Sequence, residues 1–335
     1  MICHYADMHC DTLLRGYSDG AESLYDGTGH INFKKMAEAQ QVLQFFAVFF
    51  PPEKAFEMRF GRKNPDGSRE VPDDESFYRD AVKVLHEAVD RHNDVIALAR
   101  NRTEVETNRK SGKSSAVLTI EDGRFLNDKI SRLIGLYEDG VRAIALTWNH
   151  ENCLGYPNST DPEMMNRGLK PFGIEALEEM NRLDILADVS HLNAGGFWDV
   201  AKHSHKPFIA SHSNCYAITQ HPRNLTDEQI RALADQGGIM GLNFFQSFVV
   251  PGDTVGKKNL PETTVDMLAA HIEHMYQIGG EDLPALGTDF DGFDGKPEID
   301  GPDKMELLFD RLAKDGFSER TLDKFRYENV LRVLG

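Results

Sequence analysis

Short apolar runs alternate with amphipathic segments along most of the chain. Eight of these runs have the length of a strand, and several are apolar at nearly every position, which is typical of strands buried on both faces of a sheet. They cover residues 5–9, 42–50, 116–121, 142–148, 185–190, 207–211, 238–243 and 285–290. Strand-length runs separated by helix-length segments predict parallel βα units.

The segments between the runs repeat apolar residues at helical spacing. They predict helices at 74–92, 171–183, 226–236 and 261–278, and a closing helix at 318–334. Pro171 and Pro261 suit the first turn of a helix, and Thr226 with Gln229 has the pattern of a capping box. Eight βα units in 335 residues favour an α/β fold of the (β/α)8 TIM-barrel type, as one catalytic domain over residues 1–335. A doubly wound open sheet is the alternative, because it shows the same alternation.

The composition is that of an ordinary globular protein, with 40% hydrophobic and 27% charged residues. Acidic residues outnumber basic ones by 54 to 37, and the formal net charge is −17. Without a basic run, nucleic acid and membranes are poor partners. The N-terminus lacks the pattern of a secretory signal, and no run is long enough to span a bilayer. We therefore expect a cytoplasmic protein with free thiols.

Metal-binding side chains lie at or just after the ends of the predicted strands. They are His9, Asp11, Glu121, His191, His212 and Asp289. In a (β/α)8 barrel the C-terminal ends of the strands converge on one mouth, where active sites form. His9 and Asp11 are two positions apart, so both face the same side of a strand. Each residue alone has an ordinary structural explanation, but their shared position predicts one site.

The residue types indicate the kind of metal. Imidazole and carboxylate ligands suit zinc and related transition metals better than magnesium or calcium. Three histidines with two carboxylates are too many for one tetrahedral zinc ion, and they suffice for two ions that share a carboxylate. We therefore predict two Zn²⁺ ions per chain, with other divalent metals as the alternative.

Motifs over nearly the whole chain resemble those of the membrane (renal) dipeptidase family of zinc peptidases. The matching stretches are residues 7–12 (DMHCDT), 120–123 (IEDG), 188–191 (DVSH), 211–213 (SHS), 221–224 (HPRN), 287–292 (GTDFDG) and 328–334 (ENVLRVL). Each motif is short, and the resemblance depends on their order and spacing. It implies a metal-dependent dipeptidase on a barrel.

The resemblance also implies roles for the metal ligands. His9 and Asp11 are expected to bind one zinc ion, His191 and His212 the other, and Glu121 to bridge both. A hydroxide between the ions is then expected to attack the peptide bond of a dipeptide. The resemblance implies that dipeptides with a D-residue at the C-terminal position are also accepted as substrates.

Further residues are expected to handle the substrate. The resemblance implies that Asp289 moves protons and that Arg223 binds the terminal carboxylate of the dipeptide. Some members place a substrate-binding histidine directly after Leu-Thr, where this chain has Trp148; we predict that His150 takes the role from a shifted position. Asp122 stands where the family often has glycine and is expected to add negative charge near the site.

Two other functions fit parts of the pattern. A different binuclear amidohydrolase, acting on N-acyl amino acids or cyclic amides, would typically start with His-x-His and bridge its metals with a carbamylated lysine. Here the start is His9-x-Asp11 and the bridging candidate is Glu121, which favours the dipeptidase. A non-catalytic barrel would be expected to lose ligands, yet every ligand position is filled. The sequence leaves open whether the chain forms a homodimer.

Overall fold

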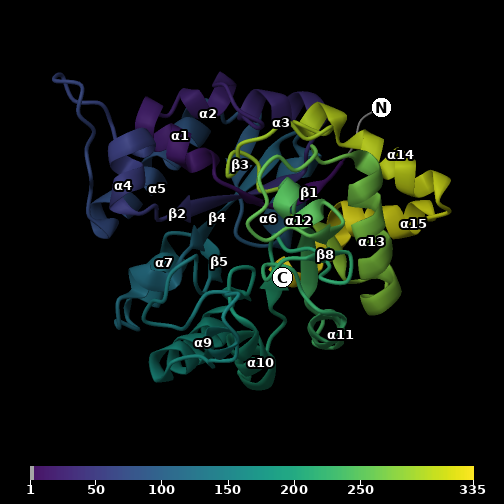
Figure 1. Ribbon diagram of the computed structural model, residues 1–335. Helices are drawn as coiled ribbons and strands as arrows, with labels where there is room; N and C mark the ends of the chain where they lie inside the picture. Colours follow the sequence, from purple (N-terminus) through teal and green to yellow (C-terminus); the bar gives the residue numbers. More distant parts are fainter. Residues whose placement is uncertain (1–3) are drawn as a thin grey trace.

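The apolar runs form the strands of a closed parallel sheet in the computed structural model, which describes residues 4–335 (Figure 1). The barrel strands are β1 (Ala6–Cys10), β2 (Leu43–Phe49), β4 (Ser114–Glu121), β5 (Val141–Ala145), β6 (Leu186–Asp188), β7 (Ile209–Ala210), β9 (Ile239–Leu242) and β11 (Pro284–Leu286). They pair in the order β2-β1-β11-β9-β7-β6-β5-β4, and β2 also pairs with β4. That last pairing closes the ring, so the predicted barrel is confirmed and the open sheet is wrong.

Every residue of these eight strands is buried. One face of each strand points into the barrel, and the other packs against the surrounding helices, which Figure 1 shows around the outside of the strands. This burial on both faces explains why the runs are apolar at nearly every position.

The sequence did not predict three short strands. β3 (Ile96–Leu98) pairs with the beginning of β4. It lies on the same edge of β4 as β5, which pairs with the later part of that strand. β8 (Thr219–Gln220) and β10 (Gly252–Asp253) pair with each other outside the barrel. Strands of two or three residues are too short to produce a recognisable hydrophobic pattern.

Helices follow the strands and cover the barrel. The longer ones are α1 (Thr12–Asp19), α3 (Phe33–Ala39), α5 (Asp74–Arg91), α6 (Arg102–Lys110), α7 (Arg132–Glu138), α9 (Pro171–Leu183), α10 (Ala194–His203), α11 (Asp227–Asp235), α13 (Val265–Gly279) and α14 (Glu306–Lys314). Shorter ones are α2 (Ser23–Asp26), α4 (Glu53–Ala55), α8 (Pro162–Met165), α12 (Gln246–Val249), α15 (Glu319–Asp323) and α16 (Asn329–Leu334). Single 3-10 or π turns lie at Phe56–Phe60, Gly123–Leu126, Pro302–Lys304 and Lys324–Glu328.

The predicted helices are confirmed, with one wrong boundary. Pro171 is the first residue of α9, and Thr226 and Gln229 form the predicted capping box at the start of α11. Pro261 does not begin α13. The side-chain oxygen of Thr264 accepts a hydrogen bond from the backbone N–H of Met267, so Thr264 caps a helix that starts at Val265. The closing helix runs from α15 through a π turn into α16.

Two glycines let the ends of β7, β9 and β11 lie close together beneath the barrel mouth. A Cβ atom at Gly241 or at Gly287 would overlap with the backbone carbonyl oxygen of Ser211, the residue that precedes His212. Side chains at these two positions would therefore push the end of β7 and its histidine out of place.

We expect Gly287→Ala to lower the free energy of unfolding by about 3 kcal/mol, because the added methyl group has no space beside the rigid backbone of β7. Gly135→Ala is the matched control, since a Cβ there meets no atom within 4 Å and the residue lies within α7. Alanine in a helix should stabilise the control variant slightly. Urea denaturation of both variants tests this, and equal stabilities would contradict it.

Candidate metal centre

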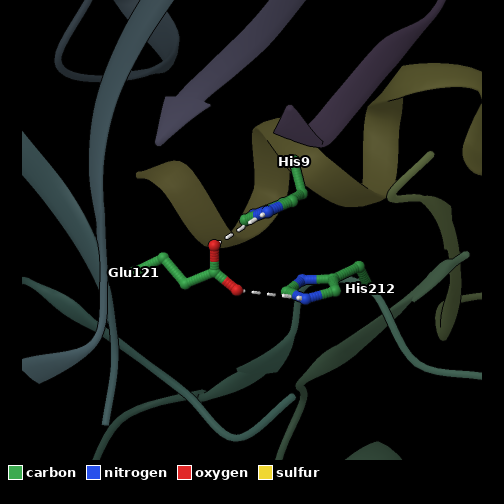
Figure 2. A group of neighbouring side chains, drawn as sticks. All are labelled: His9, Glu121 and His212. Atoms are coloured by element: carbon green, nitrogen blue, oxygen red, sulfur yellow. Dashed lines mark ion pairs between the residues drawn. The ribbon is translucent and has the colours of Figure 1, made fainter. Parts of the chain in front are cut away.

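The ends of the strands bring the five predicted metal ligands and Asp289, the predicted proton carrier, to one mouth of the barrel. His9 lies in β1 and Glu121 ends β4, while the others lie one to three residues beyond the end of a strand: Asp11 after β1, His191 after β6, His212 after β7 and Asp289 after β11. The first five are buried, with exposures between 1% and 7%. Figure 2 shows the carboxylate of Glu121 between the rings of His9 and His212.

The two oxygens of Glu121 face different histidines. Oε2 lies 3.5 Å from Nε2 of His9, while Oε1 lies 2.9 Å from Nε2 of His191 and 3.7 Å from Nε2 of His212. On the His9 side, Nε2 is also 3.7 Å from Oδ2 of Asp11 and 3.9 Å from Oδ1 of Asp289. The nitrogen and oxygen atoms that could bind a metal thus form two groups, and both groups share the carboxylate of Glu121.

This set of donors fits bound cations. Among the described residues, Nε2 of His9 and Oδ1 of Asp11 are buried without a hydrogen-bond partner, which costs about 1–3 kcal/mol for each group. The Nε2 atoms of His191 and His212 lie only 3.0 Å apart. Cations bound among these atoms would give the unpaired nitrogen and oxygen a partner and would offset the negative charge of the carboxylates. Histidine with aspartate and glutamate is a ligand set typical of zinc.

Hydrogen bonds behind the rings fix the orientation of two histidines. Nδ1 of His191 lies 3.2 Å from Oδ1 of Asn149, and Nδ1 of His212 lies 2.7 Å from Oγ of Ser211. The Ser211 hydroxyl in turn donates to the buried carboxylate of Asp188, so it accepts from the imidazole. Both rings therefore carry their proton on Nδ1 and point the Nε2 lone pair at Glu121, as metal-binding histidines do.

Burial shifts the pKa values of four of these groups. It lowers the pKa of His191 and His212 well below the usual value, which keeps both rings in the neutral form that binds metals. Burial, with the nearby charge of Asp11, raises the pKa of Glu121 to about 8 and that of Asp289 to about 6. Carboxylates gathered this closely are costly to ionise unless a cation lies among them.

Arg223 lies beside the candidate metal ligands. Its guanidinium donates to the hydroxyl of Ser213 and to the carbonyl of His212, each at 3.3 Å, and stacks over the ring of Phe248 at 5.2 Å. Its Nε is buried without a partner among the described residues. Burial lowers the pKa of Arg223 to about 10, while the nearby charge of Asp289 raises it. The guanidinium therefore stays charged at neutral pH.

A cavity of about 530 Å³ covers these groups. Its lining includes Asp11, Glu121, His191, Arg223 and Asp289, the aromatic residues Phe49, Trp148, Phe245, Phe248 and Phe293, and Lys257 and Lys258. The cavity therefore combines the candidate metal centre, a buried cation and apolar walls, which is typical of a small-molecule site.

The structure places two predicted residues away from this cavity. His150 is exposed and does not line it; its ring meets Trp148 at 5.6 Å, and Asn149 lines the cavity instead. The carboxylate of Asp122 accepts hydrogen bonds from Asn152 and from the backbone of Arg124. These hydrogen bonds stabilise the carboxylate of Asp122 at a position outside the cavity.

Asn149 and Asn243 are site residues that the sequence did not reveal. Asn149 orients His191, and Asn243 donates from Nδ2 to Oδ2 of Asp289 at 3.0 Å and to the carbonyl of His212 at 3.3 Å. Single asparagines in loops carry no pattern, although the position of Asn243 directly after a barrel strand was a usable signal.

A (β/α)8 barrel with this donor set at its mouth defines a metal-dependent hydrolase. The chain belongs to the membrane dipeptidase family (peptidase family M19), whose model matches residues 3–335. The resemblance noted in the sequence is confirmed, and the chain is a metal-dependent peptide hydrolase of this family. In residues 4–335, no helix combines the length and apolar character needed to cross a membrane.

Two curated proteins are similar in sequence. The uncharacterized protein in the pqqA 5′ region of Klebsiella pneumoniae is 35% identical over 245 residues, which cover 71% of this chain and 88% of that protein. Dipeptidase verJ of Clonostachys rogersoniana is 30% identical over 255 residues, which cover 76% of this chain and 63% of verJ.

Two solved structures are similar over their full length. The dipeptidase AC, a metallo peptidase of family M19, superimposes with a TM-score of 0.84 at 27% identity, covering 100% of this chain and 98% of that one. A metallo peptidase from Rhodobacter sphaeroides, liganded with a phosphinate mimic of the dipeptide L-Ala-D-Ala, gives a TM-score of 0.84 at 26% identity, covering 100% and 99%.

Proposed function

We propose that this chain hydrolyses dipeptides with the help of two zinc ions. The observation that carries the proposal is the position of Glu121, whose two oxygens face separate groups of donors. His9 and Asp11 would hold one zinc ion, His191 and His212 would hold the other, and Glu121 would be a ligand of both. When bound, the two ions polarise the peptide carbonyl and lower the pKa of the water that attacks it.

Asp289 is the proposed proton carrier. Its Oδ2 accepts a hydrogen bond from Asn243, while its Oδ1 faces the metal centre, 3.9 Å from Nε2 of His9. A carboxylate held in this way can take the proton of the attacking water and return it to the leaving amine. Asn243 keeps the carboxylate in place during both transfers.

Arg223 is proposed to bind the terminal carboxylate of the substrate. A guanidinium offers a planar fork that matches a carboxylate, and Nε of Arg223 is a buried donor without a partner in the described chain. A carboxylate bound here, beside the metal centre, leaves room for one residue after the cleaved bond. This arrangement excludes peptides that continue beyond that residue on the C-terminal side.

We extend the proposal to the configuration of the substrate. The Rhodobacter sphaeroides relative is liganded with a mimic of L-Ala-D-Ala, and this chain covers that structure over its whole length. We propose that the present site also accepts a D-residue at the C-terminal position.

The test is hydrolysis of L,L- and L,D-dipeptides by the zinc-loaded protein, with the chelated protein as control and elemental analysis of bound zinc. We expect release of free amino acids only with metal, and two zinc ions per chain. Fewer than two ions would contradict the binuclear centre. Two bound ions without hydrolysis of any dipeptide would shift the substrate to N-acyl amino acids or cyclic amides.

The hydrogen bonds behind His212 predict an effect on metal affinity. Ser211→Ala removes the acceptor of the Nδ1 proton and leaves the buried carboxylate of Asp188 without one donor. We expect zinc to bind about 10- to 100-fold more weakly. Competition with a chelator measures this dissociation constant. Ser204→Ala, at the end of α10 and before the start of β7, at the opposite end of the barrel, is the control; equal affinities in the two variants would refute the role of Ser211.

A further inference from the structure

Two lysines line the cavity over the candidate metal centre. Lys257 and Lys258 lie in the segment that follows β10, and both are exposed. Neither side chain makes an ion pair or hydrogen bond within residues 4–335. In a chain with a net charge of −17, these side chains place unpaired positive charge at the edge of a substrate cavity.

The lysine segment lies at the Arg223 end of this cavity. β10 pairs with β8, which ends just before the loop that carries Arg223. The hydroxyl of Thr254 donates to the carbonyl of Ser247, next to the Phe248 ring that stacks on Arg223. Since Arg223 is proposed to bind the terminal carboxylate, the lysines stand beside the C-terminal residue of the dipeptide.

The charges of the cavity do not balance at this end. Asp11, Glu121 and Asp289 lie at the candidate metal centre, where bound cations would offset their charges. Asp294, at the rim, pairs with Arg59 at 3.4 Å. Among the lining residues, Asp289 and Glu121 favour the charge of Arg223, whereas no lining carboxylate pairs with Lys257 or Lys258. An α-carboxylate bound to Arg223 therefore still leaves both lysines without an anion.

We propose that this site prefers dipeptides whose C-terminal residue has an acidic side chain, aspartate or glutamate. The inference rests on the proposed dipeptidase function. Arg223 binds the α-carboxylate, and Lys257 and Lys258 attract the side-chain carboxylate. A lysine places a compact charge on a flexible stem, so it can follow the side chain of either an L- or a D-residue.

The experiment compares kcat/KM for two matched pairs of dipeptides with an N-terminal alanine. One pair ends in aspartate or asparagine, and the other ends in glutamate or glutamine. The acid and amide of each pair have nearly the same shape, so their ratio isolates the charge. We expect the wild type to prefer the acid about fivefold, the effect of one or two exposed ion pairs. The preference should shrink as salt increases, because exposed charges are screened.

The double variant Lys257→Gln/Lys258→Gln should bring the acid-to-amide ratio to about one. Lys202→Gln, in the last turn of α10 at the opposite end of the barrel, removes one lysine charge far from the cavity and should keep the wild-type ratio. Equal rates for acid and amide in the wild type, or a preference that survives in the double variant, would overturn the inference while dipeptide hydrolysis stands. A zinc-loaded protein that cleaves none of these dipeptides would overturn the proposed function itself.

Discussion

Replacing Asp289 by asparagine should lower kcat for dipeptides about 10³-fold while the zinc content stays at the wild-type level. The amide keeps the size of the carboxylate and can still accept the hydrogen bond from Asn243, but it cannot take a proton from the attacking water. Loss of a positioned acid–base group typically costs about 10²–10⁴ in rate. Stopped-flow or coupled assays with saturating dipeptide, together with elemental analysis, measure both quantities.

The backbone at this position makes Asp289→Asn a clean test. Asp289 has a φ angle of 64°, in the left-handed region that asparagine and aspartate tolerate better than other non-glycine residues. Alanine would add strain there and confuse the result. Asp300→Asn is the control in the same β11–α14 connection, since Asp300 pairs with Lys304 at the surface and does not line the cavity.

The two readouts separate the roles of Asp289. A large loss of kcat with normal zinc supports proton transfer. Loss of zinc together with activity would make Asp289 a metal ligand, which its 3.9 Å distance to His9 also allows. Unchanged kcat would remove Asp289 from the mechanism and leave the bound water to lose its proton to solvent.

The sequence predicted the barrel because the physics of parallel sheets makes buried strands apolar on both faces. The eight barrel strands are all such runs, and the ends of parallel strands must meet at one mouth. His9, Glu121 and His212 could therefore be placed in one site although they lie far apart in the chain, and the structure brings them to within hydrogen-bonding or ion-pair distances of one another.

The loops above the strands could not be predicted in the same way. β5 ends at Ala145, before the predicted end of its run, so strand alternation cannot tell which of Asn149 and His150 faces the cavity. The contact between Asn243 and Asp289 joins two strands that are distant in sequence. Such contacts depend on the three-dimensional arrangement of the barrel mouth, which no local pattern encodes.

Arg223→Ala should lower kcat/KM for dipeptides about 100-fold or more, because a buried charge-assisted pair with the terminal carboxylate is lost. The result alone would be ambiguous, since Arg223 also donates to the carbonyl of His212 and its loss could disturb this candidate metal ligand. Zinc content should therefore be measured in parallel, and Arg223→Lys adds a variant that keeps the charge without the planar fork.

A double-mutant cycle between Arg223 and the substrate resolves this ambiguity. The second change is made in the dipeptide, whose terminal carboxylate is replaced by a carboxamide. The wild type should cleave the carboxamide about 100-fold less efficiently than the free acid, while Arg223→Ala should treat the two nearly alike, because the partner of the carboxylate is gone. If Arg223→Ala still discriminates against the carboxamide as strongly as the wild type, another residue binds the terminal carboxylate and sets the limit on the C-terminal side of the cleaved bond.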